Sequence, residues 1–166
     1  MDVPLSLERL MSFEWRVRQV YLILSNRVDL AKEVRFFCRC MAEDERQDIS
    51  VLERATQLQQ TMERVPSVSE ATLVEVEQNV VTAEALAART VLTADDVLRL
   101  ALHIEGSTLK RLDRMWIDGF GPTFGGLLQE LAPEAEIRTR RLIEAIHTFS
   151  TDPNLRAEIA ILWAEH

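Results

Sequence analysis

Glycine is absent from the first 105 residues of this 166-residue chain, and that absence restricts the folds open to it. Glycine usually marks the tight turns that join neighbouring strands. All five glycines lie after residue 105, and the five prolines are widely spaced. The long stretches between these residues are rich in Leu, Ala, Glu, Arg and Gln, which favour helices. We therefore predict an all-α fold.

Capping residues and prolines divide the chain into predicted helices. These cover residues 5–28, 30–62, 93–118, 123–149 and, as a short C-terminal helix, about 153–165. The first connection is so short that the first two helices must form an antiparallel hairpin. Pro133 predicts a kink in the fourth helix. Residues 64–92 hint at extended chain followed by a short helix from Thr82, and we interpret them as a long crossover.

One glutamate stands in an otherwise apolar stripe of the second predicted helix. Glu45 has Met41 one turn before it, Ile49 one turn after it and Leu52 two turns after it, and these positions share one helical face. Asp48 joins the same face. Carboxylates in an apolar interior cost several kcal/mol unless other groups compensate their charge. The stripe therefore predicts a buried acidic site with a compensating partner.

The other three long helices each carry a similar glutamate, and the four acids are predicted to meet at one level. They are Glu14, Glu45, Glu105 and Glu136. Two of them lie at similar distances from the turn near residue 28, and two from the turn near residue 120, so the helical rise places them at comparable heights. Four carboxylates at one level must bind protons, pair with arginine or bind cations. Carboxylates suit divalent iron or manganese, and zinc tolerates them.

Four short motifs resemble, in order, the helices of rubrerythrin-type proteins of the ferritin-like, di-iron carboxylate superfamily. They are Glu14 and Tyr21 as Glu-x6-Tyr, residues 42–48 (Ala-Glu-Asp-Glu-Arg-Gln-Asp), residues 101–105 (Ala-Leu-His-Ile-Glu) and residues 131–136 (Leu-Ala-Pro-Glu-Ala-Glu). The likeness covers residues 5–60 and 93–150. It implies an antiparallel ferritin-like four-helix bundle with a long crossover between the second and third helices. The whole chain, residues 1–166, would form one domain whose bundle spans about 5–150.

The resemblance also implies a di-iron site with glutamate ligands. Its four glutamates would be Glu14 and Glu105 as terminal ligands and Glu45 and Glu136 as bridges. Both family histidines are replaced, by Asp48 and by Thr139. Asp48 remains able to bind a metal, so we count it as a substitute ligand, whereas a neutral threonine is a poor one. Leu112 replaces a family tyrosine, and no Cys-x-x-Cys pair follows.

Two functions follow from these residues. The first is a non-haem metal-binding protein, with iron as the expected metal, that acts as an oxidoreductase on iron or reactive oxygen species if the site is active. The second is a non-catalytic helical scaffold with a degenerate site that binds another divalent metal or none. In that case the acids are protonated, hydrated or paired with Arg18, Arg46 or Arg138. The sequence identifies no redox partner.

Composition narrows the range of partners. A net charge of −8 and the lack of a basic stripe argue against nucleic acid. No apolar run approaches the roughly 20 residues that cross a bilayer, and the N-terminus lacks signal-peptide features, so we expect a cytoplasmic protein. Apolar residues off the inner stripes, including Leu22, Phe36 and Trp163, predict a homodimer. Cys38 and Cys40 would point apart on a helix, which predicts neither a disulfide nor a metal clip.

Overall fold

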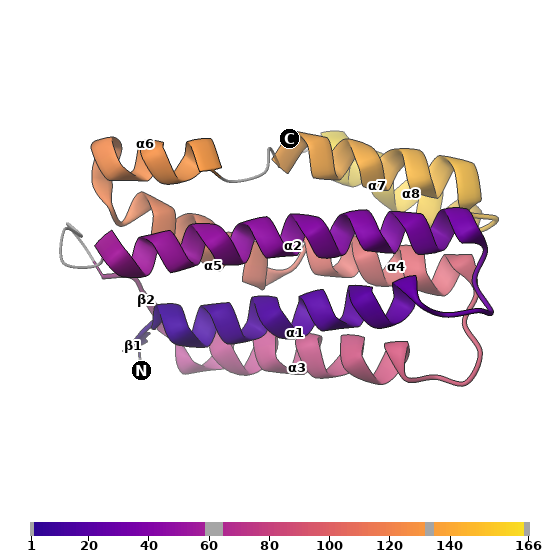
Figure 1. Ribbon diagram of the computed structural model, residues 1–166, viewed down its shortest axis with the longest axis horizontal. Helices are drawn as coiled ribbons and strands as arrows, with labels where there is room; N and C mark the ends of the chain where they lie inside the picture. The colour runs from indigo at the N-terminus through magenta and orange to yellow at the C-terminus, as the bar shows by residue number, and fades with distance from the viewer. Residues whose placement is uncertain (1, 59–64, 132–134, 165–166) are drawn as a thin grey trace.

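The computed structural model describes residues 2–58, 65–131 and 135–164, and this part of the chain is all-α apart from two short strands (Figure 1). The helices are α1 (Leu7–Ser25), α2 (Lys32–Leu58), α3 (Glu70–Ala87), α4 (Ala94–Glu105), α5 (Thr108–Asp118), α6 (Gly121–Leu131), α7 (Ala135–Phe149) and α8 (Pro153–Ala164). Strands β1 (Asp2–Pro4) and β2 (Ser67–Ser69) pair antiparallel. The all-α prediction is confirmed.

Short polar side chains set several of the helix starts. Ser6 accepts a hydrogen bond from the backbone N–H of Arg9 at the start of α1. Thr93 and Asp96 form a reciprocal capping box at the start of α4. Asp29, in the turn between α1 and α2, accepts hydrogen bonds from the Arg27 side chain and from the backbone N–H of Leu92. That contact ties the α1–α2 turn to the segment before α4.

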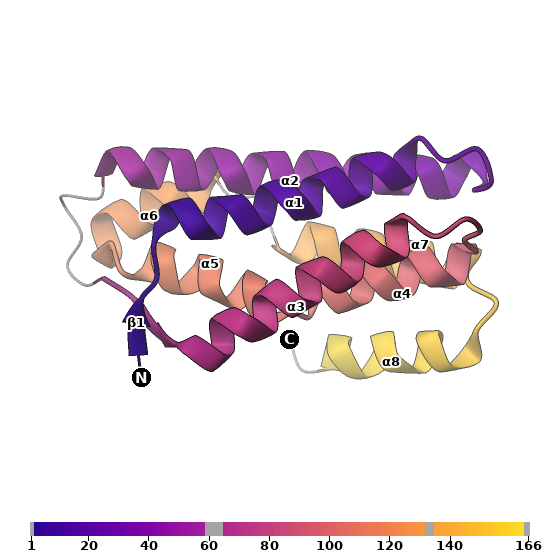
Figure 2. The ribbon, with the colours of Figure 1, turned by 90° about the horizontal axis from the view of Figure 1, so that it is seen from below.

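The helices run lengthwise along an elongated molecule (Figures 1 and 2). α1 and α2 form the predicted antiparallel hairpin, and α3 returns beside α1 in the same direction as α1. α4 and α5 follow one another along the direction of α2, and α6 and α7 follow one another in the opposite direction. α8 turns back and packs against α4 and α7. Segments from both halves of the sequence therefore surround one interior.

The segment predicted to form a crossover contains a longer helix than the sequence indicated. Extended chain is confined to β2, and α3 begins at Glu70 rather than at Thr82. Ser69 caps this start by accepting a hydrogen bond from the backbone of Thr72. Three of the residues that suggested extended chain, Leu73, Val76 and Val80, recur with a helical period on the buried face of α3, together with Ala83 and Ala87. The other two, Val74 and Val81, are exposed. Packing of this apolar face against α1 outweighs the preference of valine for strands, so the segment forms a helix.

The third predicted helix is broken, and this break shapes the site. Residues 93–118 form α4 and α5, separated at Gly106 and Ser107, rather than one continuous helix. The fourth predicted helix corresponds to α6 and α7, and the kink predicted at Pro133 lies outside the described residues. Among the described helices, none has both the length and the apolar character needed to cross a membrane.

A buried carboxylate cluster as the candidate functional site

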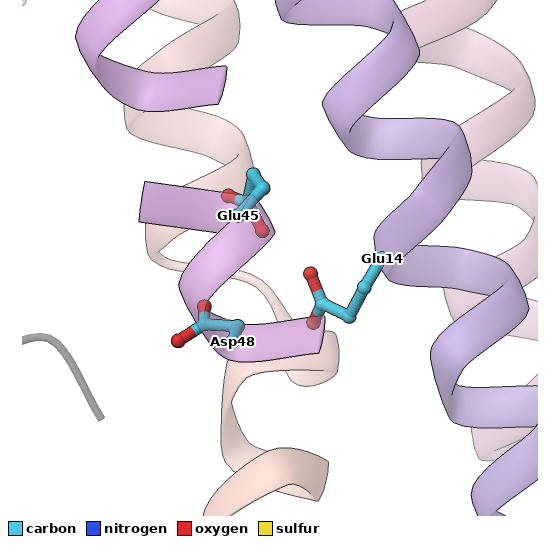
Figure 3. A group of neighbouring side chains, drawn as sticks. All are labelled: Glu14, Glu45 and Asp48. Atoms are coloured by element: carbon cyan, nitrogen blue, oxygen red, sulfur yellow. The ribbon is translucent and has the colours of Figure 1, made fainter. Parts of the chain in front are cut away.

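α1 and α2 bring three of the predicted acids together in the interior. Glu14 and Glu45 are fully buried and Asp48 is 8% exposed. One carboxylate oxygen from each lies within 4.8 Å of the others. Figure 3 shows Glu14 on α1 facing the α2 residues Glu45 and Asp48 across the hairpin. The antiparallel hairpin therefore places these three side chains at one height.

A lysine occupies the centre of this group. Lys110 extends from α5, and its Nζ donates to Glu45 Oε2 at 2.6 Å, Asp48 Oδ2 at 2.9 Å and Glu14 Oε2 at 3.1 Å. The side chain is 6% exposed. Burial by itself would lower the pKa of Lys110, but the three carboxylates raise it well above its usual value. The lysine is therefore a permanent cation at the point where the acids converge.

An arginine from α7 completes the compensation. Arg138 donates through one terminal nitrogen to Asp48 Oδ2 at 2.5 Å, and its Nε lies 3.9 Å from Glu105 Oε2. Glu105 is the last residue of α4, and its side chain is 11% exposed. Asp48 thus contacts two cations. Burial would raise the pKa of Asp48, but Lys110 and Arg138 lower it below its ordinary value, so Asp48 stays ionised.

A second ion pair flanks the cluster. Arg141 on α7 donates to Asp44 on α2, one turn of helix before Asp48. Asp44 is 7% exposed. Burial raises the pKa of Asp44, and the positive charges of Arg141 and Arg138 oppose that rise. The α2–α7 contact is therefore held by two arginine–aspartate pairs in neighbouring turns.

Asp113 on α5 is a half-buried residue whose carboxyl group lies beside Glu14. Both of its carboxylate oxygens are buried and receive no hydrogen bond from the described residues. Burial, followed by the charge of Asp113, raises the pKa of Glu14 to about 8. Burial likewise raises the pKa of Asp113 to about 7. A proton on one of these two carboxyl groups can bridge to the other and supply the donor that their oxygens lack.

The cluster contains more acids than cations. Burial also raises the pKa of Glu45, Glu105 and the Tyr21 phenol. Five buried carboxyl groups (Glu14, Glu45, Asp48, Glu105 and Asp113) face two cations (Lys110 and Arg138) in the described structure. Two positive charges compensate two carboxylates, so the remaining acids are stabilised in their protonated form. Protons and side-chain cations together offset the charge of this interior.

Glu136 does not join the cluster, which corrects the prediction that it faces the interior. Its side chain is 66% exposed and accepts from Arg140 Nη2 at 2.7 Å. Arg138, two residues later and about 200° around the helix, takes the inward position. Thr139, which the resemblance placed at the second histidine position, is half-buried. Four predicted site residues therefore lie in or beside the cluster, and the fifth lies on the surface.

Of the three arginines predicted as partners of the acids, one also lies at the cluster and two lie elsewhere. Arg138 pairs with the cluster, as the scaffold hypothesis anticipated. Arg46 instead pairs with Glu43 on the exposed face of α2, and Arg18 lies over the ring of Trp15 at 5.1 Å. One of the three arginines therefore compensates the buried acids.

Sequence reasoning missed Lys110 and Asp113. On a continuous helix, Lys110 would lie about 140° from Glu105, so both could not face the same interior. The break at Gly106 and Ser107 removes that restriction. Two features of the sequence could have indicated this arrangement. A Gly-Ser pair, Gly106-Ser107, precedes a new apolar stripe and is consistent with a helix break. The chain also has only two lysines, Lys32 and Lys110, so a lysine within an apolar stripe is unusual here.

The residues present do not fit a di-iron centre. The Lys110 ammonium lies where a metal ion bound by Glu14, Glu45 and Asp48 would lie. Glu136 points to solvent, and the group contains no histidine. An ammonium and a divalent ion cannot share this position, because the cations would repel at close range. Metal binding there requires Lys110 to leave.

Comparisons with protein-family models, with curated proteins and with solved structures found no match to this chain.

Proposed function

We propose that this chain is a non-catalytic helical scaffold in which side-chain cations replace the metal ions of a degenerate carboxylate site. One observation carries the proposal: the Nζ of Lys110 lies 2.6–3.1 Å from an oxygen of each of Glu14, Glu45 and Asp48. These distances are those of charge-assisted hydrogen bonds, which satisfy all three donors of the ammonium. The cluster then serves to hold α1, α2 and α5 in one arrangement.

The helix order supports descent from a ferritin-like four-helix bundle. α1 and α2 are antiparallel, α3 lies beside α1 and runs in the same direction, and the α4–α5 and α6–α7 lines run in opposite directions (Figure 1). This is the order expected for a bundle with a long crossover between its second and third helices. In this proposal α3 is the crossover, and Lys110 and Arg138 replace the iron of rubrerythrin-type relatives.

A second candidate function is metal binding, with iron as the expected ion and iron or reactive oxygen species as substrates. It is favoured by the three carboxylate oxygens within 4.8 Å of one another. It is also favoured by the excess of buried acids over cations, because an incoming ion could replace protons. This function requires Lys110 to move out of the cluster when the ion enters.

Amine-reactive labelling separates the two functions because the chain has only two lysines. We expect a small reagent to label exposed Lys32 of the native protein while Lys110 stays unlabelled. Adding iron(II) or manganese(II) without oxygen should not change this pattern. Labelling in urea, where both lysines should react, is the control. Peptide mass spectrometry reads out each site.

The opposite labelling result would favour metal binding. If saturating metal makes Lys110 reactive, the ion has displaced the ammonium and the scaffold proposal fails. Elemental analysis of protein purified without added metal gives an independent readout. We expect far less than one ion per chain, whereas stoichiometric metal that Glu45→Ala removes would establish the metal-binding function.

A further inference from the structure

Phe36 is a large aromatic side chain displayed on the surface. It lies in the second turn of α2 and is 64% exposed, whereas its neighbour Phe37 is 4% exposed. The remaining exposed positions of α2 are largely polar, including Glu43 and Arg46, which pair with each other. An isolated exposed aromatic surrounded by polar residues resembles the central anchor of a protein–protein interface.

A groove of about 470 Å³ opens directly beside Phe36, between α2 and α7. Its apolar surface comes from Phe36, Phe37, Ala145 and Phe149, and Cys40 lies along it. Phe37 and Ala145 are buried, so this part of the groove belongs to a packed core and offers a preformed wall. The groove is large enough to receive an aromatic side chain from another molecule.

The charged residues beside Phe36 are arranged so that this surface is complementary to the same surface of a second copy of the chain. Glu33 lies three residues before Phe36 and Arg39 three residues after it, so both share its helical face. Both are exposed, and neither forms an ion pair with another described residue. When two copies of α2 cross antiparallel at Phe36, Glu33 of each lies at the height of Arg39 of the other. A two-fold axis at Phe36 therefore creates two opposite-charge contacts at once.

We propose that this surface is the interface of a two-fold symmetric homodimer, in which Phe36 of each copy enters the α2–α7 groove of the other. The residues involved are distinct from the carboxylate cluster, so the inference does not depend on the function proposed above. It refines the homodimer predicted from the sequence. Leu22 is half-buried against the core and contributes little, and the side chain of Trp163 lies outside the described set.

Sedimentation equilibrium over a concentration series tests the aromatic anchor. We expect the wild-type protein to approach twice the 19.0 kDa mass of one chain. Phe36→Ser should weaken the dimer on the order of 10- to 100-fold, as truncation of a central anchor does. Ile161→Ser on α8 is the matched control, because Ile161 is also 64% exposed but lies on a different helix. Circular dichroism confirms that both variants are folded.

Charge reversal tests the two-fold geometry. Glu33→Arg should weaken the dimer because it places an arginine at the height of Arg39 of the second copy, and Arg39→Glu should weaken it by placing two acids together. The double variant restores both opposite-charge contacts and should recover the wild-type dissociation constant. Raising the salt concentration should reduce these differences. Recovery in the double variant would not follow from a dimer formed through any other face.

Three outcomes would overturn the proposal. The first is a wild-type protein that remains monomeric across the series, and uptake of an apolar fluorescent probe by that monomer would assign the groove to a small molecule. The second is a dimer that Phe36→Ser and Ile161→Ser affect equally. The third is a double charge reversal that is no better than either single change.

Discussion

Asp48 is the residue at which the two compensating cations meet. It accepts from Lys110 on α5 and from Arg138 on α7, so one carboxylate links three helices. Its low pKa contrasts with the raised pKa of Glu14 and Glu45, although all three are buried together. The difference arises because Asp48 has two cationic neighbours. Among Glu14, Glu45 and Asp48, Asp48 is therefore the acid whose charge is most strongly compensated.

Removing the internal cation should destabilise the fold strongly. Lys110→Met keeps a long side chain but leaves Glu14, Glu45 and Asp48 without their shared donor. We expect the free energy of unfolding to fall by about 3–5 kcal/mol, as for removal of one member of a buried ion pair. Urea denaturation at neutral pH measures this. The control is Lys32→Met. Lys32, the only other lysine, is exposed, so this change should alter stability by less than about 0.5 kcal/mol. Equal effects of the two changes would contradict the central role of Lys110.

Stability should decrease as pH rises from about 5 to about 8. The pKa values of Glu14 and Asp113, about 8 and about 7 in the folded protein, lie above their usual values of 4.5 and 3.8. In this window the folded state binds more protons than the unfolded state, so each group lowers the free energy of unfolding by at most about 1.4 kcal/mol per pH unit. Denaturant titrations across this range measure the slope.

Glu14→Gln tests the origin of that slope. The amide cannot ionise, so this variant should show a shallower decrease in stability between pH 5 and pH 8 than the wild type. Glu136→Gln, on the exposed part of α7, is the control and should leave the slope unchanged. A wild-type stability that rises with pH through this range would contradict the assignment of protonated buried acids.

At the scale of the elements, short breaks decide which side chains face inward. The break between α4 and α5 turns Lys110 into the interior together with Glu105. The next turn brings α6 against α5 so closely that a Cβ atom on Gly125 would lie 2.9 Å from the carbonyl oxygen of Ile117. Gly121, at the start of α6, has a φ of 72°, which favours glycine. The late glycines of the chain therefore shape the α5–α6 hairpin.

Adjacent glycines in α6 should respond oppositely to alanine. Gly125→Ala must push α6 away from the backbone of α5, and we expect a loss of about 1–3 kcal/mol. A Cβ atom on Gly126 meets no atom within 4 Å, so Gly126→Ala should be neutral or stabilising by up to about 1 kcal/mol through helix propensity. Thermal unfolding of both variants measures the difference. Stabilisation by both changes would show that α5 and α6 are not in close contact.

At the scale of the whole molecule, side-chain cations and protons offset the charge of the buried acids. The charges of α1, α2, α4, α5 and α7 meet in one network of buried acids, side-chain cations and protons. This network joins helices that are far apart in the sequence, so it stabilises the assembled fold more than any single helix. Loss of one cation should therefore weaken the contacts between several helices.

Refolding in the presence of a chelator should proceed normally. Protein unfolded in urea and refolded with EDTA should regain the same helicity and melting temperature as protein refolded without it, because in the proposed scaffold Lys110, Arg138 and protons compensate the acids. Binding of an ion only to the folded state would instead make the melting temperature depend on ion concentration. A melting temperature that falls with EDTA and rises with added manganese(II) would contradict a metal-independent interior.

The sequence by itself determined the helical class and the inner faces of the first hairpin. Unbroken helix-forming segments predicted α1 and α2, and two helices joined by a short turn must be antiparallel, which brings Glu14 level with Glu45. These features depend on local spacing and turn length, which are visible along the chain. The need for a compensating partner also followed from the sequence, because a buried carboxylate is costly.

Only the tertiary structure decided which groups compensate those acids. Lys110 and Arg138 come from helices distant in sequence, and their inward direction depends on where the later helices break. A shift of two residues turns a side chain to nearly the opposite side of a helix, which is why Arg138 faces inward and Glu136 outward. Periodicity alone does not locate such breaks. They are selected by packing between helices, which only the assembled molecule contains.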